Sequence, residues 1–265
     1  MILGLIGVGN MGGAILQGAV RNGYLDKDTV WISDIDHSVA LRVAQRTGAQ
    51  VAKNNIDLVQ RCDLILLAVK PVFLKGLLDE IGPFLNGKAV LSIAAGWTMA
   101  MLASAVPDDT QVMRAMPNTP ALVGEGMTAL CAEHTFNESA LSFAEGLFES
   151  IGRVCVIPER LFDGFIAVSG SSPAYVFMMI EAMADAAVKE GIFRKDAYQM
   201  AAQAVLGSAK LLLETGKHPG ELKDMVCSPA GTTIEAVAAL ESGGFRASII
   251  EAMSVCAEKS REMSK

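Results

Sequence analysis

The first 157 residues contain seven short apolar runs, several of them separated by stretches typical of helices. These runs are ILGLIGV, TVWIS, DLILLAV, AVLSIAA, QVMRAM, MTALCA and RVCVI. Strands that alternate with helices form a mostly parallel sheet with helices on its faces. The sequence therefore predicts an α/β domain of the Rossmann type over residues 1–158, which ends at the segment IPERL.

The rest of the chain, residues 159–265, predicts an all-helical domain, because strand patterns stop near Phe162. The predicted helices cover SSPAYVFMMIEAMADAAVKEG and residues 194–215, 219–225, 229–242 and 245–262. In the first of them Glu181, Asp185 and Lys189 form one narrow polar stripe, and a helix apolar on nearly all sides is buried. Hydrophobic residues make up 51% of the chain and charged residues 19%, so we expect this helix to pack in a homodimer.

Charge and cysteine content exclude several classes of partner. The net charge is −7 without a Lys/Arg cluster, so we expect no nucleic acid. The five cysteines form no CxxC pair, which favours reduced thiols, a cytoplasmic location and no metal site. Residues 1–20 and 89–107 are uncharged, but glycines interrupt the first run and AAGWT the second, so we expect no membrane span.

The segment GLIGVGNMGGA places a GxGxxG motif between a predicted strand and a predicted helix. Such glycines permit a tight turn and let a pyrophosphate approach the free N–H groups of the helix. The predicted cofactor contacts here are Gly7, Val8, Gly9, Asn10, Met11 and Gly12. The alternative is a tight turn without a ligand.

Asp34 follows the second apolar run, 22 residues after Gly12. An acid at this place can accept a hydrogen bond from the ribose 2′-hydroxyl of NADH. Alternatively, Asp34 points outward or caps the helix that starts near His37. Ser33 could still donate to a 2′-phosphate, so the predicted cofactor is NADPH or NADH.

Other strand ends extend the predicted cofactor site, because ligands of open α/β sheets bind at the carboxyl ends of the strands. They contribute Ala68, Val69, Lys70 and Pro71 of LAVKP, and Ala94 and Ala95 of AAGW. Of Asn54 and Asn55, one is expected to cap a short helix and the other to reach the adenosine ribose. Asn118 either contacts nicotinamide or substrate, or holds its turn.

The helical half contains a hydroxyl-rich segment, VCSPAGTTIEA. Ser228 is predicted to cap a helix whose first turn starts at Pro229. Small residues leave the free N–H groups of this turn open to a carboxylate, with the hydroxyls of Thr232 and Thr233 beside them. The alternative is a capped helix with a structural role alone.

The segment HPGELKDMVCSPAGTTIEAVAALESGGFRASIIEA resembles the C-terminal signature of pyrroline-5-carboxylate reductases. The segments GVGNMGGAI, LAVKP, MPNTPA and SGSSPAY match the same family in the same order. The resemblance implies NAD(P)H-dependent hydride transfer to the cyclic imine of 1-pyrroline-5-carboxylate, which gives L-proline. It also implies helical domains that interlock as dimers, which can assemble into a pentamer of dimers.

The resemblance assigns roles to individual residues. The implied substrate contacts are Glu159, Ser228, Gly231, Thr232 and Thr233. Thr233 is implied to lie nearest the ring nitrogen and to act in catalysis. Two positions depart from the family pattern: Met225 stands where some relatives have Asn, and Asp34 is unexpected in a strongly NADPH-selective member.

Three other functions remain open. A β-hydroxyacid dehydrogenase would need a basic residue on the helix over 172–188, which contains no Lys, Arg or His. A reductase of a related cyclic imine acid would use the same residues. A non-catalytic NAD(P)-binding sensor would keep the fold without turnover.

Overall fold

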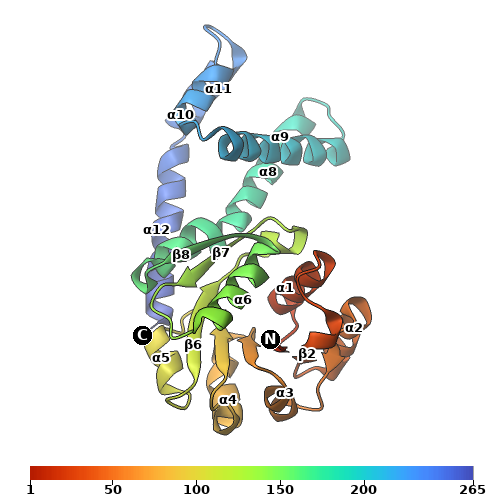
Figure 1. The fold of residues 1–265 in the computed structure, drawn as a ribbon. Helices are drawn as coiled ribbons and strands as arrows, with labels where there is room; N and C mark the ends of the chain where they lie inside the picture. Colours follow the sequence, from red (N-terminus) through yellow and green to blue (C-terminus); the bar gives the residue numbers. More distant parts are fainter. Residues whose placement is uncertain (265) are drawn as a thin grey trace. The chain divides into compact units, whose positions relative to one another are not determined.

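The computed structural model describes residues 1–264, and Figure 1 shows its ribbon. Its strands are β1 (Leu3–Ile6), β2 (Val30–Ser33), β3 (Gln50–Val51), β4 (Leu64–Leu67), β5 (Ala89–Ser92), β6 (Gln111–Met116), β7 (Gly126–Cys131) and β8 (Gly152–Ile157). The helices between them are α1 (Asn10–Arg21), α2 (His37–Thr47), α3 (Asn55–Arg61), α4 (Pro71–Ile81), α5 (Met99–Ser104) and α6 (Glu138–Glu149). The later helices are α7 (Phe162–Phe165), α8 (Ser172–Lys189), α9 (Arg194–Thr215), α10 (Pro219–Val226), α11 (Thr232–Ser242) and α12 (Phe245–Met263).

The strands of the described chain form one sheet in the order β3-β2-β1-β4-β5-β6-β7-β8. Its paired strands run parallel, except that β6 and β7 are antiparallel. The predicted mostly parallel sheet is therefore confirmed. The sequence pattern missed β3, because Gln50–Val51 is too short to form an apolar run.

Helices cover both faces of the sheet, and β4 shows why. Leu64 and Leu66 join a buried cluster with side chains of α1, α2 and α6. Ile65 and Leu67 point to the other face, where they pack with side chains of α3, α4 and α5. Successive strand residues face opposite sides, so an uninterrupted apolar strand requires a cover on each.

The chain forms two compact units, and the first contains the β-sheet. This unit runs from Met1 to Ser171 and includes the segment that begins at Cys256, whereas Ser172–Val255 form the second. The boundary predicted from sequence, residue 158, follows the end of β8. Residues 159–171 nevertheless stay with the first unit, because Phe162 and Phe165 are buried in its core.

The last part of α12 is held in the first unit by polar and close contacts. The Ser260 hydroxyl donates to Asp163 Oδ1 at 2.6 Å. Gly96 has φ +78°, and a Cβ atom there would lie 2.8 Å from the carbonyl oxygen of Met263. A glycine is therefore required at this contact.

The helices of the second unit carry exposed apolar side chains. On α8 the exposed fractions of Phe177 and Met178 are 65% and 69%. Within the described residues, the helical stretch Glu159–Lys189 is long and apolar enough to cross a membrane, with a hydropathy of 1.3. This is weak evidence for a membrane span, because the stretch begins in the core of the first unit, where Phe162 is buried. A protein partner explains the exposed apolar surface of α8 more simply.

Candidate active site

The loop between β1 and α1 forms a cradle of small residues. Gly7 has φ +93°, and a Cβ atom on Gly12 would lie 2.0 Å from the Gly7 carbonyl oxygen. A Cβ atom on Gly9 would meet no described atom within 4 Å. Gly9 precedes α1 and forms no side-chain cap, so the first N–H groups of α1 face open space that suits a phosphate.

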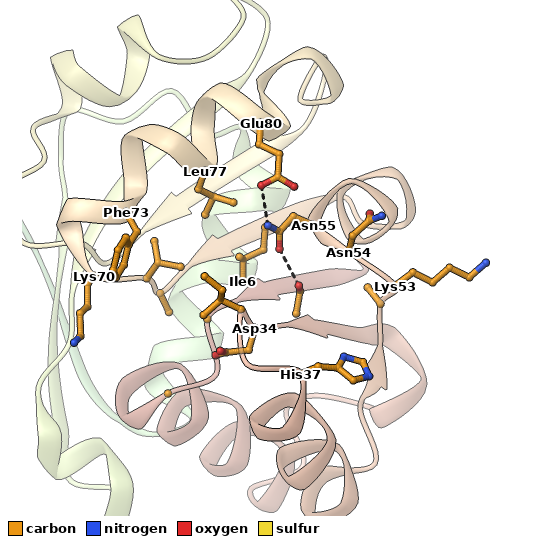
Figure 2. Close-up of a pocket in the computed structure, with 17 residues that line it drawn as sticks. Ile6, Asp34, His37, Lys53, Asn54, Asn55, Lys70, Phe73, Leu77 and Glu80 are labelled. Carbon is orange, nitrogen blue, oxygen red and sulfur yellow. Dashed lines mark hydrogen bonds between the residues drawn. The ribbon is translucent and has the colours of Figure 1, made fainter.

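A cleft of about 980 Å³ lies beside this loop (Figure 2). It adjoins the carboxyl ends of β1, β2 and β4, and the strand order reverses between β1 and β4. Ligands of open α/β sheets bind at such reversal points. The predicted cofactor residues that line the cleft are Gly7, Gly9, Ser33, Asp34, Asn55, Ala68, Val69 and Lys70.

The other predicted cofactor residues do not line this cleft: Val8, Asn10, Met11, Gly12, Pro71, Ala94 and Ala95. The cleft is also lined by residues that were not among the predicted cofactor contacts: Ile6, Ile35, His37, Ala52, Lys53, Asn54, Phe73, Leu77 and Glu80. Three of them, Phe73, Leu77 and Glu80, are spaced as one face of α4. That spacing, directly after LAVKP, was visible in the sequence.

Asp34 holds the glycine loop from the end of β2. Its Oδ2 accepts a hydrogen bond from the backbone N–H of Val8 at 2.8 Å, and its Oδ1 accepts from the N–H of Asp36 at 3.0 Å. Asp36 caps α2 by accepting from the N–H of Ser38 at 2.9 Å. Asp34 therefore neither caps α2 nor points away, but lines the cleft with one oxygen committed to the loop.

Of the two neighbouring asparagines, one caps α3 as expected, whereas contact of the other with the adenosine ribose stays a prediction. Asn54 Oδ1 accepts from the N–H of Asp57 at 2.8 Å and caps α3. Asn55 lines the cleft, where its Oδ1 accepts from the Ser33 hydroxyl at 2.8 Å. Its Nδ2 donates to Glu80 Oε2 at 3.1 Å, so β2, α3 and α4 are joined by side chains (Figure 2).

The hydroxyl-rich segment of the second unit differs in detail from its prediction. Helix α11 begins at Thr232, and its N-cap is Gly231, which makes no side-chain cap bond in the described chain. Ser228 is therefore not the N-cap, and the prediction was wrong. Ala230 has φ +55°, and the N–H of Gly231 donates to the Ser228 carbonyl at 3.0 Å, so a tight turn precedes the helix.

This turn leaves the start of α11 uncapped. A Cβ atom on Gly231 would lie 2.2 Å from Ser228 Oγ, so a larger residue there would force the Ser228 side chain to rotate. The first N–H groups of a helix lack intrahelical partners, and here no side chain of the described residues caps them. The hydroxyls of Thr232 and Thr233 stand in the same first turn, an arrangement that suits a carboxylate.

Comparisons with known proteins place the chain in a family. The family model for pyrroline-5-carboxylate reductase dimerisation matches residues 159–263. The model described as NADP oxidoreductase, coenzyme F420-dependent, matches residues 2–96. Pyrroline-5-carboxylate reductase from Escherichia coli is 48% identical, over 99% of this chain and 98% of its own length. The chain belongs to the pyrroline-5-carboxylate reductase family.

Other members of the family agree in sequence and in structure. Pyrroline-5-carboxylate reductase from Methanosarcina acetivorans is 40% identical over 99% of this chain and 98% of its own length. The Plasmodium falciparum pyrroline carboxylate reductase, crystallised with NADP bound, superposes with a TM-score of 0.90 at 30% identity, covering 100% of this chain and 98% of its own. The resemblance stated from the sequence motifs is confirmed, and the cofactor class is NAD(P).

The Glu159 carboxylate accepts two hydrogen bonds from within the protein. Its Oε1 accepts from the N–H of Met99 at 2.7 Å and from Arg114 Nη1 at 3.1 Å. Arg114 is only 3% exposed, and its guanidinium lies over the Phe162 ring, 4.5 Å from the centroid. A buried cation needs a counter-charge, which this oxygen of Glu159 supplies. The contact of Glu159 with substrate stays a prediction.

Asn118, in the MPNTPA motif of the family, holds its turn. It is buried, and its Nδ2 donates to the carbonyl and to the hydroxyl of Ser169, both at 3.1 Å. Its Oδ1 accepts from the N–H of Met127 at 2.9 Å. The side chain is thus occupied within the protein, which decides between the two roles left open from the sequence.

Replacing Asn118 with alanine is expected to lower the free energy of unfolding by about 1–3 kcal/mol, because the Met127 N–H and the Ser169 groups lose their partner in a buried place. Urea unfolding without cofactor measures the change. Asn10→Ala, at an exposed position of the same unit, serves as the control and should unfold with the wild type. Equal stability of all three proteins would contradict the structural role of Asn118.

Two of the free cysteines, Cys62 and Cys131, are buried in the first unit. Burial raises the pKa of the Cys62 and Cys131 thiols to about 12, so both stay neutral and unreactive near neutral pH. No group of three or more His, Cys, Asp or Glu side chains within residues 1–264 is placed to hold a metal ion.

Proposed function

We propose that this protein is a pyrroline-5-carboxylate reductase that uses NAD(P)H to convert 1-pyrroline-5-carboxylate into L-proline. The observation that carries the proposal is the 48% identity with the Escherichia coli reductase over 99% of the chain. Two features of the chain support it. The glycine cradle leaves room for a dinucleotide, and the uncapped start of α11 suits the carboxylate of the substrate.

Hydride transfer to a cyclic imine places few demands on protein side chains. Bound NAD(P)H supplies the hydride, which adds to the imine carbon while the C=N electron pair moves onto the ring nitrogen. A protonated imine is already electrophilic, and its positive charge disappears as the bond forms. The protein must therefore orient the two reactants and exclude other geometries, for which neither a metal nor a nucleophile is required.

The proposed roles follow from the first turn of α11. The backbone N–H groups of Thr232 and Thr233 bind the substrate carboxylate, assisted by the partial positive charge of the helix N-terminus. The Thr233 hydroxyl hydrogen-bonds the ring nitrogen, with Ser228 and Gly231 shaping the turn that exposes these groups. This orientation raises the fraction of bound substrate that is ready to react.

A homodimer through the second unit is part of the proposed assembly. The dimerisation model matches residues 159–263, and a second copy would cover the exposed Phe177 and Met178 of α8. A larger ring, such as a pentamer of dimers, is proposed from the family alone. A cytoplasmic location is proposed from the free cysteines.

The test follows the absorbance of NADH and NADPH separately after adding 1-pyrroline-5-carboxylate to the purified protein. We expect substrate-dependent oxidation, at least about tenfold faster than with the six-membered homologue, since one methylene changes binding by ~1–3 kcal/mol. Faster turnover of the six-membered ring would identify a reductase of a related cyclic imine acid. Cofactor binding without imine-dependent oxidation would identify a non-catalytic sensor and overturn the proposal.

A further inference from the structure

The cleft contains a hydrogen-bonded chain of three side chains at the end of β2. The Ser33 hydroxyl donates to Asn55 Oδ1 at 2.8 Å, and Asn55 Nδ2 donates to Glu80 Oε2 at 3.1 Å (Figure 2). All three residues line the cleft. In folds of this type the end of the second strand contacts the adenosine ribose, where NADH has a 2′-hydroxyl and NADPH a 2′-phosphate.

Glu80 determines which groups donate and which accept in these two hydrogen bonds, because a carboxylate can only accept. The amide nitrogen of Asn55 therefore turns toward Glu80, and its oxygen turns toward Ser33. The Ser33 hydroxyl must then donate, and its one proton is used. What Ser33 offers to a ligand is a lone pair, which can accept from a 2′-hydroxyl but cannot donate to a 2′-phosphate.

The charges around these hydrogen bonds also disfavour a 2′-phosphate. Asp34 and Glu80 both line the cleft and bring two carboxylates to it. Lys53 also lines it, but its side chain extends away from the Ser33–Asn55 bond in Figure 2. Lys70 is the residue before α4, and its side chain lies on the other side of the view from Lys53. A 2′-phosphate beside Ser33 would therefore lie among acceptors and carboxylates.

We infer that Glu80 is a positioning residue for cofactor choice: it orients Asn55, which commits the Ser33 proton, and the cleft thereby favours NADH over NADPH. The inference rests on the proposed use of NAD(P)H, and it goes further by naming the preferred cofactor and the residue that sets the preference. Without Glu80, the Asn55 amide can reverse, and Ser33 is free to donate to a phosphate.

The test measures dissociation constants of NADH and NADPH from the fluorescence of the bound reduced nicotinamide, without imine substrate. Wild type is expected to bind NADH more tightly. Glu80→Leu is expected to shift the affinity ratio toward NADPH about tenfold, as for a hydrogen bond to a charged group. In a Ser33→Ala background the same change should shift the ratio several-fold less, because only the loss of the Glu80 charge then acts on the phosphate.

Asp79→Asn is the matched control, since Asp79 lies next to Glu80 on α4 and pairs with Lys75 instead of lining the cleft. It should leave the ratio unchanged. A purely structural role of Glu80 would weaken both cofactors equally and leave the ratio unmoved, which would overturn the inference. So would a wild-type preference for NADPH, or an equal shift in both backgrounds. Failure to bind either cofactor would instead contradict the proposed function.

Discussion

Gly9→Ala is expected to weaken NADH binding by about two orders of magnitude or more, since hydrogen bonds to charged phosphate oxygens are worth ~1.5–3 kcal/mol each. A methyl group on Gly9 would point into the open space before α1, where no described atom lies within 4 Å. The protein alone can accommodate it, because Gly9 has φ −66°, which alanine adopts readily. The proposed pyrophosphate would clash with the methyl group, because both need the same space.

Titration of NADH against the variant measures the loss, and thermal unfolding without cofactor checks the fold. Gly76→Ala on α4 is the matched control, because a Cβ atom there also meets no described atom and Gly76 does not line the cleft. The control should bind NADH as the wild type does. Normal binding by Gly9→Ala would mean that the phosphates lie elsewhere.

Gly12→Ala, whose Cβ would lie 2.0 Å from the Gly7 oxygen, should instead lose stability as well.

Thr233→Ala is expected to lower kcat/KM for 1-pyrroline-5-carboxylate by about 10- to 100-fold, as for the loss of a hydrogen bond to a charged group. Thr233 is the second residue of α11, in the turn whose N–H groups are uncapped. Its hydroxyl is proposed to bond the ring nitrogen as the positive charge there disappears. The backbone N–H groups that bind the carboxylate remain in the variant, so binding of substrate should suffer less than turnover.

Steady-state kinetics at saturating NADH measure this effect, and the dissociation constant of NADH should not change. Thr233→Ser keeps the hydroxyl and should recover most of the activity. If Thr233→Ala stays within twofold of wild type (about 0.4 kcal/mol), Thr233 has no role in the transition state. A loss confined to KM would reduce Thr233 to a substrate contact.

Much of the fold could be predicted from the sequence, because it depends on local patterns. Apolar runs such as DLILLAV predict buried parallel strands, and GxGxxG between a strand and a helix predicts the loop at Gly7. The short strand β3 carries no such pattern, because two residues cannot show a period. The packing of residues 159–171 into the first unit depends on contacts of Phe162 that composition does not reveal.

The site was harder to predict where it depends on conformation or on distant contacts. Ser228 has the residue type of an N-cap, but the left-handed backbone of Ala230 delays the helix to Thr232. Non-glycine residues seldom adopt that conformation, so no residue pattern indicates it. The bond between Asn55 and Glu80 joins residues 25 positions apart, and only the packing of α3 beside α4 brings them together.

The segment that begins at Cys256 completes the first unit, although all of the second unit precedes it in the chain. On a ribosome, residues up to Ser171 therefore emerge long before the last piece of their own fold. Until then, the Asp163 carboxylate lacks its Ser260 partner, and the site facing Gly96 is not filled by Met263. The first, NAD(P)-binding unit therefore stays incompletely packed until residues 172–255 have been synthesised. During that interval it is accessible to chaperones and proteases.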